Sequence, residues 1–269
     1  MKKASFIFIF FVIIVAAKSG LANSKVLFWY PGEAGSSTEA QPILDEFINY
    51  LANKIPQLKL QATYFNTTKE GLNFIKQQKP LLGIISFSAW IENKGKISAA
   101  QPWLATRPFP SGKTEEKYIL VKKMKSEFKP ALILSSEPLS SDFILNHLQF
   151  ETAKNIPAKA TNQILFELKK IAEGKLNAYA ILTPTEAYTF KKMDLPWTKE
   201  IKILEESKPV PTARVILFGT TSKHIDELKQ TLLQIGADPA ALEILDEMRL
   251  KGFAPINAQP ETLQTSPQQ

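Results

Sequence analysis

A strand, a loop and a helix follow one another within residues 25–51, and this succession constrains the fold more than any other stretch. Residues 25–30 are rich in β-branched and aromatic side chains, which favours a buried strand that stops at Pro31 and Gly32. Within residues 40–51 the apolar side chains recur every three or four positions, as on the buried face of a helix. The segment therefore predicts a β–α unit of an α/β protein.

The same alternation continues along the chain in two cycles. The first cycle has further strands at 58–65 and 81–85, each followed by a helical segment. The second cycle has strands at 131–134, 156–160 and 176–182, again with helices between them. Such alternation with short connections is typical of parallel strands covered by helices. We therefore expect an α/β fold of two lobes, each with a mostly parallel sheet flanked by helices.

Two proline-rich segments, 102–112 and 207–212, mark the predicted crossings between the lobes. Residues 23–112 and 207–256 are accordingly expected to form lobe 1, and residues 113–206 to form lobe 2. The two lobes are therefore expected to be connected by two crossings of the chain.

The two ends of the chain are expected to lie outside the lobes. Residues 1–22 combine two N-terminal lysines, an uncharged apolar run and small residues up to Ala22, the pattern of a secretory signal that is cleaved after that residue. An uncleaved N-terminal anchor is the alternative. A periplasmic location follows from this prediction. The last element is expected to be a helix over 239–250 ended by Gly252, and the Gln-, Pro- and Thr-rich residues 257–269 to be a disordered tail.

The composition narrows the chemistry that the chain can perform. The absence of cysteine excludes disulfides and thiolate sites. The formal net charge is +7, and +4 remains once the three lysines of residues 1–22 are removed. The other lysines are interleaved with acids, without the basic block typical of nucleic-acid binding. His147 and His224 lie far apart, and the sequence has no phosphate-binding loop or nucleophile elbow. We therefore expect no catalysis, no cofactor, no metal site and no nucleic-acid partner.

Hydroxyl-rich turns recur where the predicted strands give way to helices. In open α/β sheets ligands bind beyond the carboxyl ends of the strands, and helix N-termini favour anions. Helix capping is the alternative for each turn taken alone. Arg107 and Arg214 flank the two crossings and are further candidates for anion contact, with salt links at the hinge as the alternative. The predicted ligand-binding residues are Tyr30, Ser36, Ser37, Thr38, Ser86, Ser88, Ser135, Ser136, Ser140, Ser141, Thr183 and Thr185.

Four stretches are similar to a known family. Residues 71–88 read as a helix and a strand that ends in a small-residue turn, 172–180 read Ala-Glu-Gly-Lys-Leu-Asn-Ala-Tyr-Ala, and 207–214 read Ser-Lys-Pro-Val-Pro-Thr-Ala-Arg. With residues 250–255 at the C-terminal end, they resemble the type 2 periplasmic solute-binding proteins, specifically the phosphate/phosphite/phosphonate-binding branch. The resemblance covers nearly the whole mature chain. It implies two lobes that are joined by a two-strand hinge, close on a small anionic ligand and deliver it to an ABC transporter permease in the inner membrane. We expect a monomer.

Two departures from the family leave the ligand and the role open. Only residues 122–129 follow the predicted strand at 117–121, where the family has a longer helical insert. Asp142 stands where the family has a small residue, and a carboxylate in the cleft repels an anion unless it faces away or pairs with an amine of the ligand. The alternative is therefore a sensor or accessory protein of the same fold that docks on a membrane partner.

Overall fold

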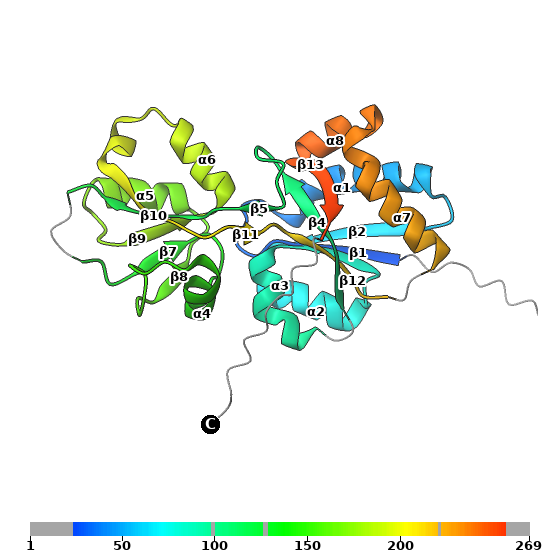
Figure 1. Ribbon diagram of the computed structural model, residues 1–269, viewed down its shortest axis with the longest axis horizontal. Helices are drawn as coiled ribbons and strands as arrows, with labels where there is room; N and C mark the ends of the chain where they lie inside the picture. The colour runs from blue at the N-terminus through cyan, green and yellow to red at the C-terminus, as the bar shows by residue number, and fades with distance from the viewer. Residues whose placement is uncertain (1–23, 98–99, 126–128, 220–221, 257–269) are drawn as a thin grey trace, which may run out of the picture.

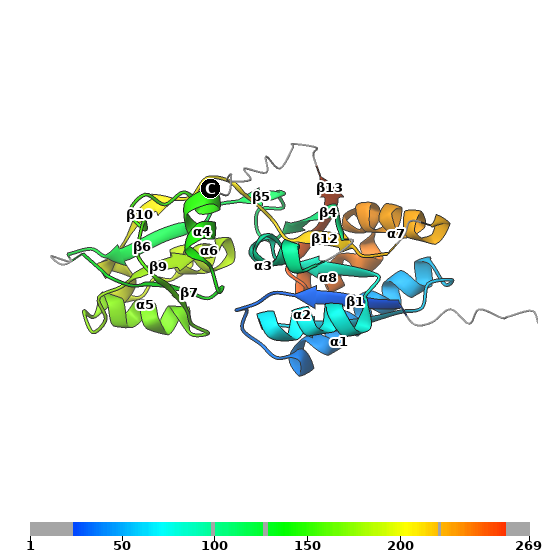
Figure 2. The same cartoon turned by 90° about the horizontal axis from the view of Figure 1, so that it is seen from below.

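Two β-sheets, each covered by helices, lie side by side and are joined by two extended segments (Figure 1). The computed structural model describes residues 24–97, 100–125, 129–219 and 222–256. The predicted signal segment and the predicted tail lie outside these residues. Figure 2 shows the same two bodies turned by 90°, with β5 (Glu115–Glu116) between them. In the part of the chain that the structure describes, no helix is long and apolar enough to cross a membrane.

The larger sheet and its helices form lobe 1. Its six strands lie in the order β13-β4-β12-β3-β1-β2. Helices α1, α7 and α8 cover one face, and α2 and α3 cover the other (Figure 1). Each face has its own apolar core, which contains Phe47 on the first side and Trp29 on the second. The strands are β1 (Ser24–Trp29), β2 (Leu60–Phe65), β3 (Leu82–Ile85), β4 (Gln101–Pro108), β12 (Arg214–Leu217) and β13 (Leu250–Pro255). The helices are α1 (Ser37–Lys54), α2 (Thr68–Gln78), α3 (Phe87–Asn93), α7 (Lys223–Gln234) and α8 (Leu242–Glu247).

The smaller sheet and its helices form lobe 2. Its five strands lie in the order β10-β6-β9-β7-β8. One face packs on the short helix α4 and its continuation as a π-helix, and the other packs on α5 and α6. The strands are β6 (Ile119–Lys123), β7 (Ile133–Ser135), β8 (Ala158–Ala160), β9 (Tyr179–Leu182) and β10 (Ile201–Glu206). The helices are α4 (Ser141–Phe143), the π-helix (Ile144–Leu148), α5 (Ile164–Ala172) and α6 (Pro184–Lys192).

The strand directions differ from the mostly parallel sheets expected from the sequence, because both sheets are mixed. Strands β12 and β13 run antiparallel to their neighbours in the larger sheet, and β6 and β10 do so in the smaller one. The chain crosses between the lobes twice, and β6 and β12 each enter a lobe from the hinge. They therefore run against β1, β3, β7 and β9, whose carboxyl ends all lie at the hinge end of their sheets.

The hinge itself is a pair of antiparallel segments, β5 and β11 (Val210–Pro211). Hydrogen bonds of side-chain hydroxyls connect the two segments that cross between the lobes. Thr212 donates to the carbonyl oxygen of Thr106 at 2.7 Å, and the N–H of Tyr118 donates to the Ser207 hydroxyl at 2.9 Å. The two-strand hinge that was predicted is thus confirmed.

The C-terminal element differs from the helix expected over 239–250. Helix α8 already ends at Glu247, and Arg249 takes a left-handed conformation with φ of +53°. The chain then returns as β13 and pairs with β4, which places Phe253 in the core of lobe 1 at 3% exposure. The prediction was wrong here because local periodicity does not report a pairing between segments far apart in the sequence.

Candidate functional site

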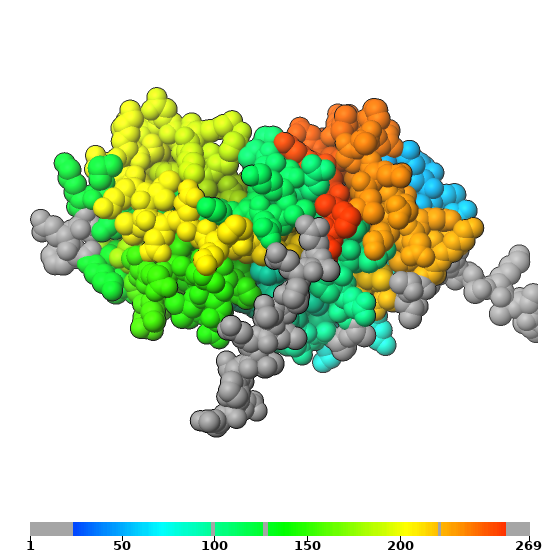
Figure 3. All heavy atoms as spheres, viewed as in Figure 1, coloured from blue at the N-terminus to red at the C-terminus, as the bar shows by residue number. Residues whose placement is uncertain are grey.

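The loops that follow β1 and β7 meet across the cleft between the lobes. Gly32 has a φ of +89°, and a Cβ atom at this position would lie 2.0 Å from the carbonyl oxygen of Ser136. A second contact joins the lobes nearby, where the carboxylate of Glu92 in α3 accepts the N–H of Ser140 at 2.7 Å. The space-filling view in Figure 3 shows the two lobes meeting at a waist in the middle of the molecule. The lobes are therefore closed on each other.

Four of the predicted hydroxyls are buried at the carboxyl ends of β3 and β7. Ser86 caps α3 by accepting the N–H of Ala89 at 3.3 Å, and its oxygen lies 3.2 Å from that of Ser88. Ser135 is 1% exposed, and its hydroxyl has no hydrogen-bond partner among the described residues. Ser136 lies in the contact with Gly32. The structure therefore brings the turns after β3 and β7 together at the cleft.

Other predicted hydroxyls make the helix caps that were the alternative interpretation. Ser36 and Glu39 form a reciprocal capping box at the start of α1, and Thr183 and Glu186 form another at the start of α6. The Ser37 hydroxyl donates to the carbonyl of Tyr64 at 2.9 Å. Four further hydroxyls remain. Ser140 caps α4, Thr38 and Ser141 are exposed, and Thr185 is half-buried. A role of these residues in ligand binding stays a prediction.

Glu137 links the two lobes beside this contact. Its carboxylate accepts the hydroxyl of Ser88 from lobe 1. It also accepts the hydroxyl of Tyr118, which lies 3.2 Å from each carboxylate oxygen. Burial raises the pKa of Glu137 to about 7 despite the opposing hydrogen bond from Ser88, and the negative charge of Glu186 raises it further. A protein carboxylate thus takes one of the hydroxyls that were predicted to bind an external anion.

Glu33 places a second carboxylate on the lobe 1 side of the cleft. The side chain of Glu33 is exposed, but the protein atoms around it displace part of its hydration shell. This partial desolvation raises the pKa of Glu33 to about 7. The charge of Glu186 acts in the same direction, and Arg249 opposes it. Burial, followed by the charge of Glu33, also raises the pKa of the Tyr30 hydroxyl. Carboxylates from both lobes therefore approach closely enough to influence one another.

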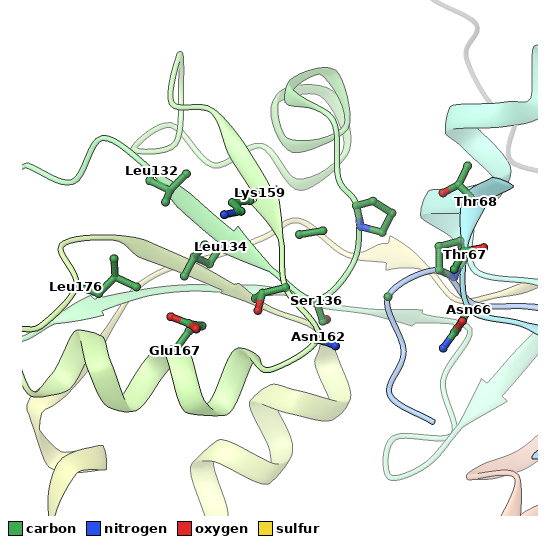
Figure 4. A pocket seen from close by; sticks show the side chains of 15 residues that line it. Asn66, Thr67, Thr68, Leu132, Leu134, Ser136, Lys159, Asn162, Glu167 and Leu176 are labelled. Atoms are coloured by element: carbon green, nitrogen blue, oxygen red, sulfur yellow. The ribbon is translucent and has the colours of Figure 1, made fainter. Parts of the chain in front are cut away.

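A cavity of about 650 Å³ lies beside the contact and takes its walls from both lobes (Figure 4). Figure 4 shows Asn66, Thr67 and Thr68 on one side, opposite Ser136 and Asn162 on the other. The cavity continues along lobe 2, where apolar side chains of β7 and its surroundings line it. Its complete lining is Pro31, Gly32, Asn66, Thr67, Thr68, Leu132, Leu134, Ser136, Pro138, Lys159, Ala160, Thr161, Asn162, Glu167 and Leu176.

The charged candidates near the crossings have partners inside the protein. The guanidinium of Arg214 is buried and lies 5.7 Å from the centre of the Phe87 ring. Arg107 donates through Nε to the carbonyl oxygen of Gly112 at 2.8 Å. Asp142 is exposed in the first turn of α4.

Several residues of the cleft were not among the ligand-binding residues predicted from the sequence. Some of them lie in the same turns as the predicted residues. Glu137 follows Ser136 directly, and Glu33 lies one residue after Gly32. An anion site requires hydrogen-bond donors, so the hydroxyls of these loops were predicted as ligands and the carboxylates beside them were not. Lys159 and Asn162 belong to β8 and the turn after it, where the sequence has no hydroxyl cluster to draw attention.

Two α/β lobes, a hinge of two antiparallel segments and a cavity lined from both lobes together define the fold of the type 2 periplasmic binding proteins. The resemblance inferred from the sequence is thereby confirmed at the level of the fold. A comparison with protein-family models gives no match, and a comparison with curated proteins gives none either.

Solved structures with this fold include binding proteins for different ligands. XAC2383 from Xanthomonas citri, bound to chloride ion, is 13% identical with a TM-score of 0.68 over 88% of this chain and 93% of its own. A binding protein component of an ABC phosphonate transporter, PA3383 from Pseudomonas aeruginosa, is 12% identical with a TM-score of 0.63 over 87% and 82%. PhnD1 from Prochlorococcus marinus, in complex with methylphosphonate, is 12% identical with a TM-score of 0.60 over 87% and 93%.

Proposed function

We propose that this protein is a periplasmic solute-binding protein that captures a small solute between its lobes and presents it to an ABC importer. The cavity with walls from both lobes is the observation that carries the proposal. A solute held there touches both lobes, so its binding energy stabilises the closed arrangement that a permease recognises. The predicted secretory signal of residues 1–22 supports the periplasmic location.

We take the solute to be an anion. Two of the structural neighbours described above are titled as bound to chloride and to methylphosphonate, and another structure of XAC2383 is titled as bound to ATP. The basic net charge of this chain agrees with such a ligand. The carboxylate of Glu137 already accepts the Ser88 hydroxyl, however. An anion would therefore avoid this position and bind elsewhere between the lobes.

The bond between Glu137 and Ser88 also favours a second candidate function, a sensor or accessory protein without a transported solute. In this alternative the protein's own carboxylate replaces the ligand at the cleft and keeps the lobes in the arrangement that a membrane partner recognises.

A thermal-shift screen of residues 23–269 distinguishes the two functions. The panel contains phosphate, phosphite, methylphosphonate, short organic carboxylates and amino acids. A ligand at about 100 times its Kd stabilises a protein by roughly 2.7 kcal/mol, which moves the melting temperature measurably. A saturable shift with one chemical class supports solute capture. The absence of a shift with every member of the panel contradicts it and favours the accessory function.

A further inference from the structure

We propose that the interlobe cavity binds a small organic anion that has an apolar body, and that Lys159 binds the charged group of this anion. The inference rests on the proposed function and makes it more specific, since it names the class of solute and the residues that select it. It places the charged group in lobe 2, away from the predicted hydroxyl turns at the starts of α1 and α3.

The charges of the cavity favour an anion at this position. Its lining contains two charged side chains, Lys159 of β8 and Glu167 of α5. The Glu167 carboxylate lies 2.9 Å from the ammonium of Lys170, so its charge is compensated by the protein. Lys159 makes no ion pair within the described residues. The cavity therefore offers one positive charge that a bound anion would neutralise.

The walls favour an apolar body attached to that charge. Leu132, Leu134 and Leu176 line the lobe 2 part of the cavity, and Pro31 and Pro138 line it near the contact between the lobes. A volume of about 650 Å³ corresponds to roughly 20 water molecules. An inorganic oxyanion would fill only a small part of this space and leave the partly buried side chains of Leu132 and Leu176 in contact with water. An aliphatic or aromatic group would cover them, which is the favourable term in most small-molecule sites.

Two polar side chains from opposite lobes are free to orient the solute. The amide of Asn66 is engaged, since it donates to the carbonyl of Gly35 at 2.6 Å, and the Thr67 hydroxyl is bonded to Glu70 at 2.6 Å. Thr68 in lobe 1 and Asn162 in lobe 2, by contrast, make no side-chain hydrogen bond among the described residues. A solute that contacts both would hold the lobes together.

The test measures binding of a homologous series of linear carboxylates, from acetate to octanoate, to residues 23–269 by calorimetry. Affinity should rise by about fourfold for each added methylene until the apolar walls are covered. The matched linear alcohols, which lack the charge, and inorganic phosphate, which lacks the apolar body, should each bind at least tenfold more weakly than the best carboxylate.

Lys159→Gln should lower the affinity for the best carboxylate by roughly tenfold or more, because a charged hydrogen bond is lost. Lys154→Gln is the matched control, since Lys154 is exposed in lobe 2 and does not line the cavity. Both lysines are exposed, so both variants should fold with the melting temperature of the parent protein.

The outcomes separate this inference from the proposed function. Equal affinity of the Lys159→Gln variant and the parent protein, or phosphate binding as tight as that of the best carboxylate, overturns the inference but leaves solute capture intact. The absence of binding by the carboxylates and by every ligand of the thermal-shift panel overturns both.

Discussion

Gly32 is the residue on which closure of the lobes most directly depends. Replacement by alanine places a Cβ atom 2.0 Å from the Ser136 carbonyl oxygen, and a backbone atom of the facing loop cannot yield as a flexible side chain does. We expect Gly32→Ala to hold the lobes apart and to lower solute affinity by tenfold or more. Small-angle scattering should report a larger radius of gyration than that of the parent protein.

Gly35→Ala is the matched control for this effect. Gly35 also has a positive φ, +104°, but the nearest atom to its Cβ position is a Glu39 oxygen at 3.8 Å. Both variants bear the cost of a left-handed alanine, about 1–2 kcal/mol, and only Gly32→Ala adds the collision between lobes. Equal scattering and equal affinity for the two variants would show that closure does not require the Gly32 contact.

Ser36→Ala separates the two interpretations of the first hydroxyl turn. The Ser36 hydroxyl accepts the N–H of Glu39 at 3.3 Å in a capping box, so its loss should lower the free energy of unfolding by about 1 kcal/mol. Urea denaturation measures this change, with the exposed neighbour Thr38→Ala as control. A fall in solute affinity without a change in stability would instead support the predicted role of Ser36 as a ligand donor.

At the scale of single residues, the sequence predicted where the hydroxyl side chains lie better than it predicted their hydrogen-bond partners. The hydroxyl-rich turns were placed at the ends of β3 and β7 from the order of the segments alone, and the structure has them at these strand ends. The partners of their hydroxyls could not be inferred, because Ser88 bonds to Glu137 of the other lobe. Only the three-dimensional closure of the lobes brings these two residues together.

At the scale of elements, the packing of α2 on β1 depends on Gly71. The indole of Trp29 donates to the Thr67 carbonyl at 3.0 Å, and a Cβ atom at Gly71 would lie 2.3 Å from the indole nitrogen. We expect Gly71→Ala to lower the free energy of unfolding by about 1–3 kcal/mol, as overpacking of a full core does. Chemical denaturation followed by tryptophan fluorescence measures the loss. Gly95→Ala, where no atom lies within 4 Å of the Cβ position, should be close to neutral, and equal stability of the two variants would contradict the packing argument.

The elements also show where local sequence signals end. Helices α1 and α2 were predictable because apolar periodicity and the capping residues Ser36 and Thr67 coincide. Strand β13 was not predictable from local signals, because the apolar spacing of a helix continues up to the start of the strand. The strand is stabilised by pairing with β4, which lies more than a hundred residues earlier. The mixed sheets were missed for a related reason, because direction in a sheet depends on how often the chain crosses between lobes.

At the scale of the whole molecule, the two lobes bring carboxylates together when they close. Glu33 comes from lobe 1, and Glu137 and Glu186 come from lobe 2. Arg249 partly offsets their charge at Glu33, and the hydroxyls of Ser88 and Tyr118 stabilise the ionised form of Glu137. Desolvation nevertheless dominates at both residues and raises the pKa of Glu33 and of Glu137 to about 7. Closure and protonation are therefore linked.

The sign of this linkage follows from the direction of the pKa shifts. We expect opening of the lobes to rehydrate both carboxyls and to return their pKa values from about 7 towards the ordinary 4.5. The closed form would then bind more protons than the open form. The stabilisation of the closed form is thus complete below about pH 4.5 and is lost as the pH rises through 7. With a fluorophore pair on the two lobes, energy transfer should fall between pH 5 and pH 8 in the parent protein and change less in the Glu33→Gln and Glu137→Gln variants. Glu243→Gln, at an exposed position of α8, should retain the parent's profile. A parent protein whose energy transfer is constant over this range would show that the cleft carboxylates do not govern closure.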